Sequence, residues 1–233
     1  MKRLLLLIAC ALMLWGCEFN RETEPVLGAT RYTHHYISDF TIGDKLRIGI
    51  DNSYQDPHIL ELFFENSFIG GLKPEIREAL YEKYGDTSYD RVVPLDPGLT
   101  ACYANEFELI EITSSADFGD IKAGESLAEI VMFRSASAKP FIDSKYTVPG
   151  VWTEEIKSEI GYYSMGLLNQ WRQYSHPIVK RVCDLTPEDM KLLLEDLFSL
   201  RFTQTPEIKE HTITVSLVDN EKRHTAQIDL VFP

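Results

Sequence analysis

The sequence predicts an α+β domain, built on an antiparallel β-sheet or sandwich-like core with helical insertions and a C-terminal β-hairpin. Two neighbouring alternating apolar patterns at the end of the chain indicate the hairpin. Helical patterns separate the shorter strand candidates, and strands and helices do not alternate regularly. Because regular alternation is typical of a doubly wound parallel sheet, that architecture is disfavoured.

Composition is typical of a folded globular protein. The 233 residues are 44% hydrophobic, 11% aromatic and 25% charged. Thirty-six acidic residues outnumber 23 basic ones, and the net charge of -13 disfavours a nucleic-acid partner. No repeat and no low-complexity tract is visible, so we expect one globular domain over residues 31–233.

The chain begins with a pattern typical of an export signal. Lys2 and Arg3 precede an uncharged apolar run from Leu4 to Leu14. Eleven residues are too short to cross a hydrocarbon core as a helix, which takes about 20. The pattern therefore predicts a signal peptide over residues 1–16, not a transmembrane anchor.

The end of this run resembles the bacterial lipobox, in the order Leu14-Trp15-Gly16-Cys17. This resemblance implies that Cys17 becomes the new N-terminus and carries diacylglycerol on its sulfur. A competing match at Cys10 leaves too short an apolar run before it. Removal of residues 1–16, with Lys2 and Arg3 among them, leaves 217 residues and a net charge of -15. We therefore expect membrane attachment through acyl chains on Cys17, without help from the body's own charge.

A polar stretch follows the lipidation candidate. Residues 17–30 contain Glu18, Glu22, Glu24 and Pro25, and they predict a flexible tether.

Apolar patterns, with proline and glycine at the boundaries, predict the first helices and strands of the body. Lys45–Ile50 and Phe107–Thr113 are rich in Ile and Leu, which favours strands. Between them, Lys73–Tyr84 has helical apolar spacing, with Pro74 at its start and Gly85 at its end.

Two more helices are expected in the second half. Residues 152–174 keep a period near 3.6 in their apolar positions. Thr186-Pro187-Glu188-Asp189 has the composition of a helix start, and Met190, Leu193, Leu194 and Leu197 follow it at helical spacing.

The closing hairpin has the clearest pattern. Ile213, Val215 and Leu217 alternate with polar residues, and a second alternation follows the turn residues Asp219-Asn220-Glu221-Lys222.

A search for chemistry finds no catalytic motif, so no catalytic residue, cofactor or metal ligand is assigned. The six histidines are scattered, and we interpret them as surface or turn residues. Asp86–Asp90 has the first spacings of a calcium loop, but Arg91 and Pro97 stand where glycine and glutamate are needed, so an exposed polar loop is expected. The aromatic residues of 152–174 could form a sugar platform, but their helical spacing favours a core stripe.

Cys102 and Cys183 are the remaining cysteines of the mature body. Export would place them in an oxidising compartment, so they are a candidate disulfide, with two separate thiols as the equal alternative.

The middle of the chain contains a run of short motifs, Ala101-Cys102-Tyr103-Ala104, Phe107–Thr113, Ser114-Ser115-Ala116-Asp117-Phe118 and Ala123-Gly124-Glu125-Ser126-Leu127. Together with the closing hairpin, these motifs resemble a pattern in a family of uncharacterised lipoproteins from Bacteroides-type bacteria. This resemblance implies a lipid-anchored protein of the cell envelope, in the outer membrane, with the periplasmic or the surface face left open. It carries no activity over.

Two functions are therefore expected. The first is a non-catalytic binding or structural module that meets an envelope protein or a glycan. The alternative is a lipid-anchored hydrolase or glycan-handling enzyme, with dispersed acids converging beside Trp152 or Trp171.

Overall fold

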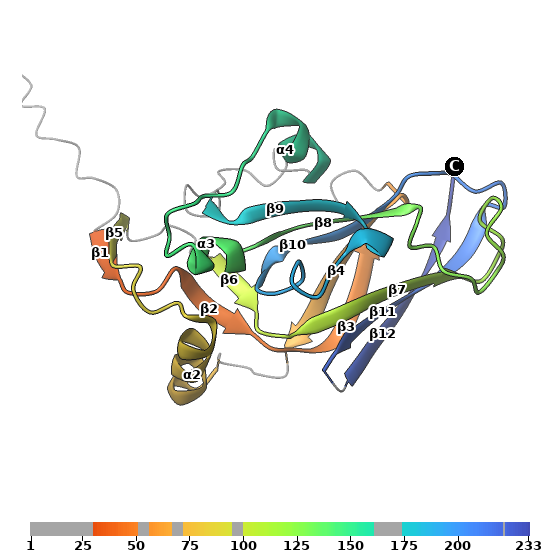
Figure 1. The fold of residues 1–233 in the computed structure, drawn as a ribbon. Coiled ribbons are helices and arrows are strands. Elements are labelled where there is room, and N and C mark those ends of the chain that lie inside the picture. Colours follow the sequence, from red (N-terminus) through yellow and green to blue (C-terminus); the bar gives the residue numbers. More distant parts are fainter. Residues whose placement is uncertain (1–29, 51–55, 67–71, 95–99, 161–173, 221) are drawn as a thin grey trace, which may run out of the picture.

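The computed structural model describes residues 30–50, 56–66, 72–94, 100–160, 174–220 and 222–233. It is mostly β-sheet with few helices, which confirms the α+β, sandwich-like fold class. In chain order the elements are β1 Thr30–Thr33, β2 Ile37–Thr41, β3 Gly43–Ile50, β4 Ile59–Asn66, α2 Pro74–Tyr84, β5 Arg91–Pro94, β6 Thr100–Tyr103, β7 Phe107–Ser114, β8 Val131–Ser137, α3 Lys139–Asp143, α4 Glu154–Ile160, β9 His176–Arg181, η3 Val182–Asp184, β10 Leu193–Phe202, β11 Glu210–Asp219 and β12 Lys222–Val231 (Figure 1).

The largest sheet is centred on β10. This strand pairs with β8 along one edge and with β4 and β6 along the other, in each case antiparallel. β3 extends the sheet beyond β4, β9 extends it beyond β8, and β2 joins β6 as a parallel neighbour. β10 therefore has neighbours on both edges, and its pairing with β8 is interrupted by an irregularity between Leu193 and Phe198.

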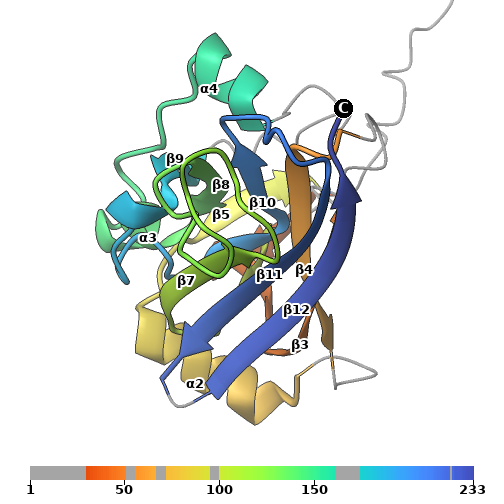
Figure 2. The ribbon, with the colours of Figure 1, turned by 90° about the vertical axis from the view of Figure 1, so that its right-hand side faces the viewer.

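The C-terminal hairpin is confirmed. β11 and β12 pair along their whole lengths, from Glu210 opposite Val231 to Asp219 opposite Lys222. β7 adds a third strand against β11, which also confirms the predicted strand 107–113. Figure 2 shows β11 and β12 side by side in the foreground. The predicted strand 45–50 is likewise confirmed as part of β3.

The apolar side chains form two cores. The first includes side chains of the three-stranded sheet, such as Ile213 and Leu217, and of the large sheet, such as Leu60 and Leu200. The second gathers residues of β2, α2 and α3, with Phe141 among them. β10 contributes to both cores, and this strand therefore links the two halves of the molecule.

The helix predicted over Lys73–Tyr84 is confirmed as α2. Pro74 opens it, and Gly85 ends it with a φ of 75°, a left-handed conformation that glycine adopts without steric cost. Tyr81 and Tyr84 turn inward and are buried, whereas most of the helix is exposed.

The helix predicted from Thr186 is wrong. The cap chemistry does form, because the Thr186 backbone N–H donates to Asp189 Oδ2 at 2.9 Å. A short turn follows, Leu192 then takes a φ of 49°, and the chain continues as β10. Leu193 packs in the first core while Leu194 and Leu197 pack in the second, so burial on both faces of a strand outweighs the helical spacing.

The helix predicted over 152–174 is present in part. α4 occupies Glu154–Ile160, and residues 161–173 lie outside the described residues. The signal peptide 1–16 and the tether up to residue 29, with Cys10 and Cys17, also lie outside them. Within the described ranges, no helix combines the length and hydropathy needed to cross a membrane.

Candidate functional site

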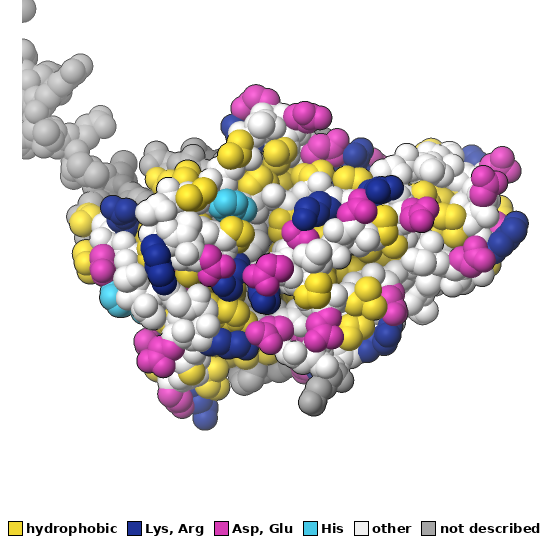
Figure 3. Space-filling model, viewed as in Figure 1, with side chains coloured by type: hydrophobic (Ala, Val, Ile, Leu, Met, Phe, Trp, Pro, Cys, Tyr) yellow, Lys and Arg dark blue, Asp and Glu magenta, His cyan; other side chains and the backbone are white. Residues whose placement is uncertain are grey.

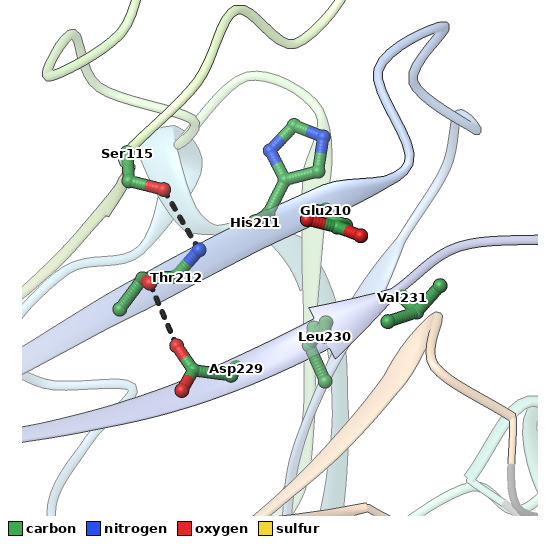
Figure 4. A pocket seen from close by; sticks show the side chains of 7 residues that line it. All are labelled: Ser115, Glu210, His211, Thr212, Asp229, Leu230 and Val231. Atoms are coloured by element: carbon green, nitrogen blue, oxygen red, sulfur yellow. Dashed lines mark hydrogen bonds between the residues drawn. The ribbon is translucent and has the colours of Figure 1, made fainter.

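A cavity of about 450 Å³ opens beside the C-terminal hairpin (Figure 4). Its walls come from the residue after β7, the start of β11 and the end of β12. The lining residues are Ser115, Glu210, His211, Thr212, Asp229, Leu230 and Val231.

Thr212 organises the polar side of this cavity. Its hydroxyl donates to Asp229 Oδ1 at 2.7 Å, and its backbone N–H donates to Ser115 Oγ at 2.8 Å. Glu210 stands opposite Val231, two pairs along from Thr212 and Asp229 and therefore on the same face of the ladder. Residues at such diagonal positions lie about 7–8 Å apart, so two carboxylates border one space. The site is suited to a ligand that offers hydroxyl or amine donors.

At the edge of the cavity, His211 forms a buried pair with Ser114. His211 Nε2 lies 2.7 Å from the carbonyl oxygen of Ile208, which can only accept, so this nitrogen donates. His211 Nδ1 lies 2.6 Å from Ser114 Oγ. The arrangement has the distances of a nucleophile and its base, but Ser114 and His211 are only 4% and 3% exposed. We interpret the pair as a link between the end of β7 and the start of β11.

The alternating pattern of the hairpin contains a local signal for this cavity. Glu210, Thr212 and Asp229 occupy the polar positions of the predicted hairpin. Once the turn at Asn220 sets the strand register, these three residues are neighbours on one face.

A second polar centre lies at Asp86. The segment 86–90 is a loop, as expected, and Thr87, Ser88 and Asp90 are exposed, but the expectation is wrong for Asp86 and Tyr89, which are buried. The Asp86 side chain is buried and accepts three hydrogen bonds of 2.8 Å, from the backbone N–H groups of Tyr36 and Ile37 and from the Tyr146 hydroxyl. Burial raises the pKa of Asp86, and these hydrogen bonds oppose the rise. The ring of His35 donates from Nδ1 to the Asp86 carbonyl oxygen. The carboxylate therefore joins the end of α2 to the start of β2.

The six histidines differ in exposure, and His35, His58 and His176 are half-buried. His34 is exposed, with its Nδ1 2.6 Å from Asp90 Oδ1. His211 and His224 are only 3% and 4% exposed and lie within strands, so the interpretation as surface or turn residues is wrong for these two. No group of three or more potential metal ligands occurs among the described residues.

Trp152 packs against the second core and is hydrogen-bonded within the fold. Its indole N–H donates to the Ser175 carbonyl oxygen at 2.9 Å, and the ring packs against the second core together with Ile156 and Tyr174. This agrees with the core interpretation for the described part of the aromatic stripe. Trp152 does not line the cavity at the hairpin, and Trp171 lies outside the described residues.

Cys102 and Cys183 are thiols in the structure. Cys102 is buried in β6, where it pairs with Leu194 of β10, and Cys183 is exposed in η3. The two residues occupy different environments, and the candidate disulfide stays a prediction.

Comparison of the chain with protein-family models, with curated proteins and with solved structures found no match.

Proposed function

We propose that this protein is a lipid-anchored lipoprotein of the bacterial cell envelope whose folded body is a non-catalytic binding module. The observation that carries the proposal is the N-terminal pattern, in which Lys2 and Arg3, an apolar run and Cys17 follow one another at the spacing of a lipoprotein signal. Acyl chains on Cys17 would hold the body in the outer membrane, facing either the periplasm or the cell surface.

The cavity beside the hairpin is the binding site that we assign to this module. Glu210 is exposed, and one oxygen of Asp229 is held by the Thr212 hydroxyl. Carboxylates arranged in this way accept hydrogen bonds from sugar hydroxyls or from amines on an envelope protein. The ligand class is therefore a glycan or a basic protein segment.

The alternative, a glycan-handling hydrolase, is favoured by one observation, the two carboxylates that border the cavity. A pair of acids is the usual machinery of glycoside hydrolysis. Glycan cleavage by the protein, lost in Asp229→Asn with binding retained, would favour the enzyme over the binding module.

Substitution of Cys17 tests the anchor. In cells fed a fatty-acid probe, we expect Cys17→Ala to abolish labelling and to move the protein from the membrane fraction to the soluble fraction, because only a thiol can carry the thioether lipid.

Cys10→Ala is the matched control, since Cys10 is the competing lipobox match, and it should leave labelling unchanged. A second control, Cys183→Ala, removes the exposed thiol of the body. Labelling that survives Cys17→Ala would defeat the assignment.

A further inference from the structure

Exposed apolar side chains gather at one end of the molecule. Among the described residues, four of the nine large apolar side chains that are exposed belong to this end. They are Tyr32 and Val92, each 64% exposed, Val148 at 54% and Val151 at 72%.

Tyr32 and Val92 form one apolar face of a small ribbon. They stand directly opposite each other in the antiparallel pair β1–β5. Thr33, the next residue of β1, is buried, so the ribbon turns one face inward and the other to solvent. The Asp90 side chain raises the pKa of the Tyr32 hydroxyl, and the exposed tyrosine has an apolar ring with a polar tip.

The loop that contains Val148 and Val151 is held at the same end. Tyr146, which precedes it, packs its ring against Tyr89 with centroids 5.2 Å apart. The Tyr89 backbone N–H in turn donates to the His34 carbonyl oxygen at 2.9 Å, directly after β1. Figure 1 shows β1, β5 and this loop at the end opposite the C-terminus, and Figure 3 shows the same face in space-filling form.

This end is also where the chain enters the described domain. β1 begins at Thr30, thirteen residues after Cys17. Thirteen residues span at most about 45 Å when fully extended, so a lipid on Cys17 keeps β1 within that distance of the bilayer. The tether therefore holds this end of the molecule closer to the bilayer than it holds the other end.

We propose that Tyr32, Val92, Val148 and Val151 form a docking surface that rests on the phospholipid bilayer carrying the anchor. This proposal rests on the lipid attachment at Cys17. The valine side chains enter the boundary between headgroups and acyl chains, and the amphipathic Tyr32 ring lies at headgroup level. With a mature net charge of -15, the contact is apolar and does not depend on anionic lipid.

The test places a nitroxide label on the docking surface of the full lipoprotein, reconstituted in phosphatidylcholine vesicles. Cys183→Ser removes the exposed thiol, and Cys102 is fully buried, so a label reacts at one introduced cysteine. The labelled positions are Val92→Cys and, as the matched control, Phe63→Cys on β4, which is 46% exposed and lies outside the docking surface.

We expect the ratio of oxygen to water-soluble nickel collisions to be several-fold higher at position 92 than at position 63. Adding Tyr32→Asp should return the label at position 92 to an aqueous environment while the protein still sediments with the vesicles. Equal aqueous accessibility at both positions in sedimenting protein would overturn the docking surface and leave the anchor standing. Loss of sedimentation together with loss of fatty-acid labelling would overturn both proposals.

Discussion

Asp86 illustrates how a single buried side chain joins segments that are distant in the sequence. Its carboxylate receives two backbone N–H groups at the start of β2 and the hydroxyl of Tyr146, sixty residues further along the chain. Each of these donors would be left unsatisfied in the interior if the carboxylate were removed, and an unsatisfied buried group costs about 1–3 kcal/mol. The residue acts as a structural hydrogen-bond acceptor.

The raised pKa of Asp86 gives this role a pH dependence. Because the folded protein binds the Asp86 proton more tightly than the unfolded chain, whose pKa is near 3.8, the contribution of Asp86 to the free energy of unfolding is fully present below that value. The contribution declines as the pH rises through the folded pKa.

We therefore expect Asp86→Asn to lower the free energy of unfolding by about 1–3 kcal/mol, because its amide group would face backbone donors. The loss should be larger at about pH 4 than at about pH 7, as measured by urea denaturation. Asp120→Asn, at an exposed acid, is the control and should show neither effect. A loss that grows with pH would mean that the folded pKa lies below its ordinary value.

Two segments with similar helix signals in the sequence form different secondary structures, since α2 is a helix and β10 is a strand. Both segments begin with a proline near a helix start and continue with apolar residues at helical spacing. α2 lies at the surface and buries only the side that contains Tyr81 and Tyr84. An amphipathic helix can bury one face in this way. β10 lies between β8 and β4, where a strand can bury both of its faces.

The central position of β10 predicts a large cost for shortening its side chains. Leu200 is fully buried in the first core, and Leu200→Ala should lower the free energy of unfolding by about 2–5 kcal/mol. Leu109 of β7 is 48% exposed, and Leu109→Ala should cost within about 0.5 kcal/mol. Urea denaturation of both variants measures the difference, and comparable losses would contradict the placement of β10.

On the scale of the whole molecule, the two cores share one strand. Leu200 and Phe202 of β10 belong to the first core, while Leu194 and Leu197 belong to the second. Neither core can lose its order without exposing part of β10, so we expect the described body to unfold as one cooperative unit.

Two spectroscopic probes can check this expectation. Far-UV circular dichroism reports mainly on the sheets. In a Trp171→Phe background, tryptophan fluorescence reports on the second core, against which Trp152 packs. The two urea midpoints should coincide in this background, and Leu197→Ala should lower both together, since Leu197 is 4% exposed. A fluorescence midpoint that moves alone would indicate two independent units.

Some residues of the polar sites are brought together by local strand pairing, and others by contacts with segments that are distant in the sequence. Glu210, Thr212 and Asp229 lie in a hairpin, so their proximity follows from the strand register. The burial of Asp86 and of His211 depends on Tyr146 and Ser114, which belong to other segments of the chain. No local pattern at Asp86 or His211 could predict those partners.

Local patterns were enough to predict the α+β class, the closing hairpin, the strands at 45–50 and 107–113, and helix α2, because alternation, turn residues and helix caps act within a few positions. The sequence also supplied the expectation of a lipid on Cys17, which stays a prediction. Only the tertiary structure decided that residues 193–202 form a strand and that Asp86, His211 and His224 are buried. The physical reason is that burial and hydrogen bonding between distant segments contribute more free energy than the local preferences of the residues involved.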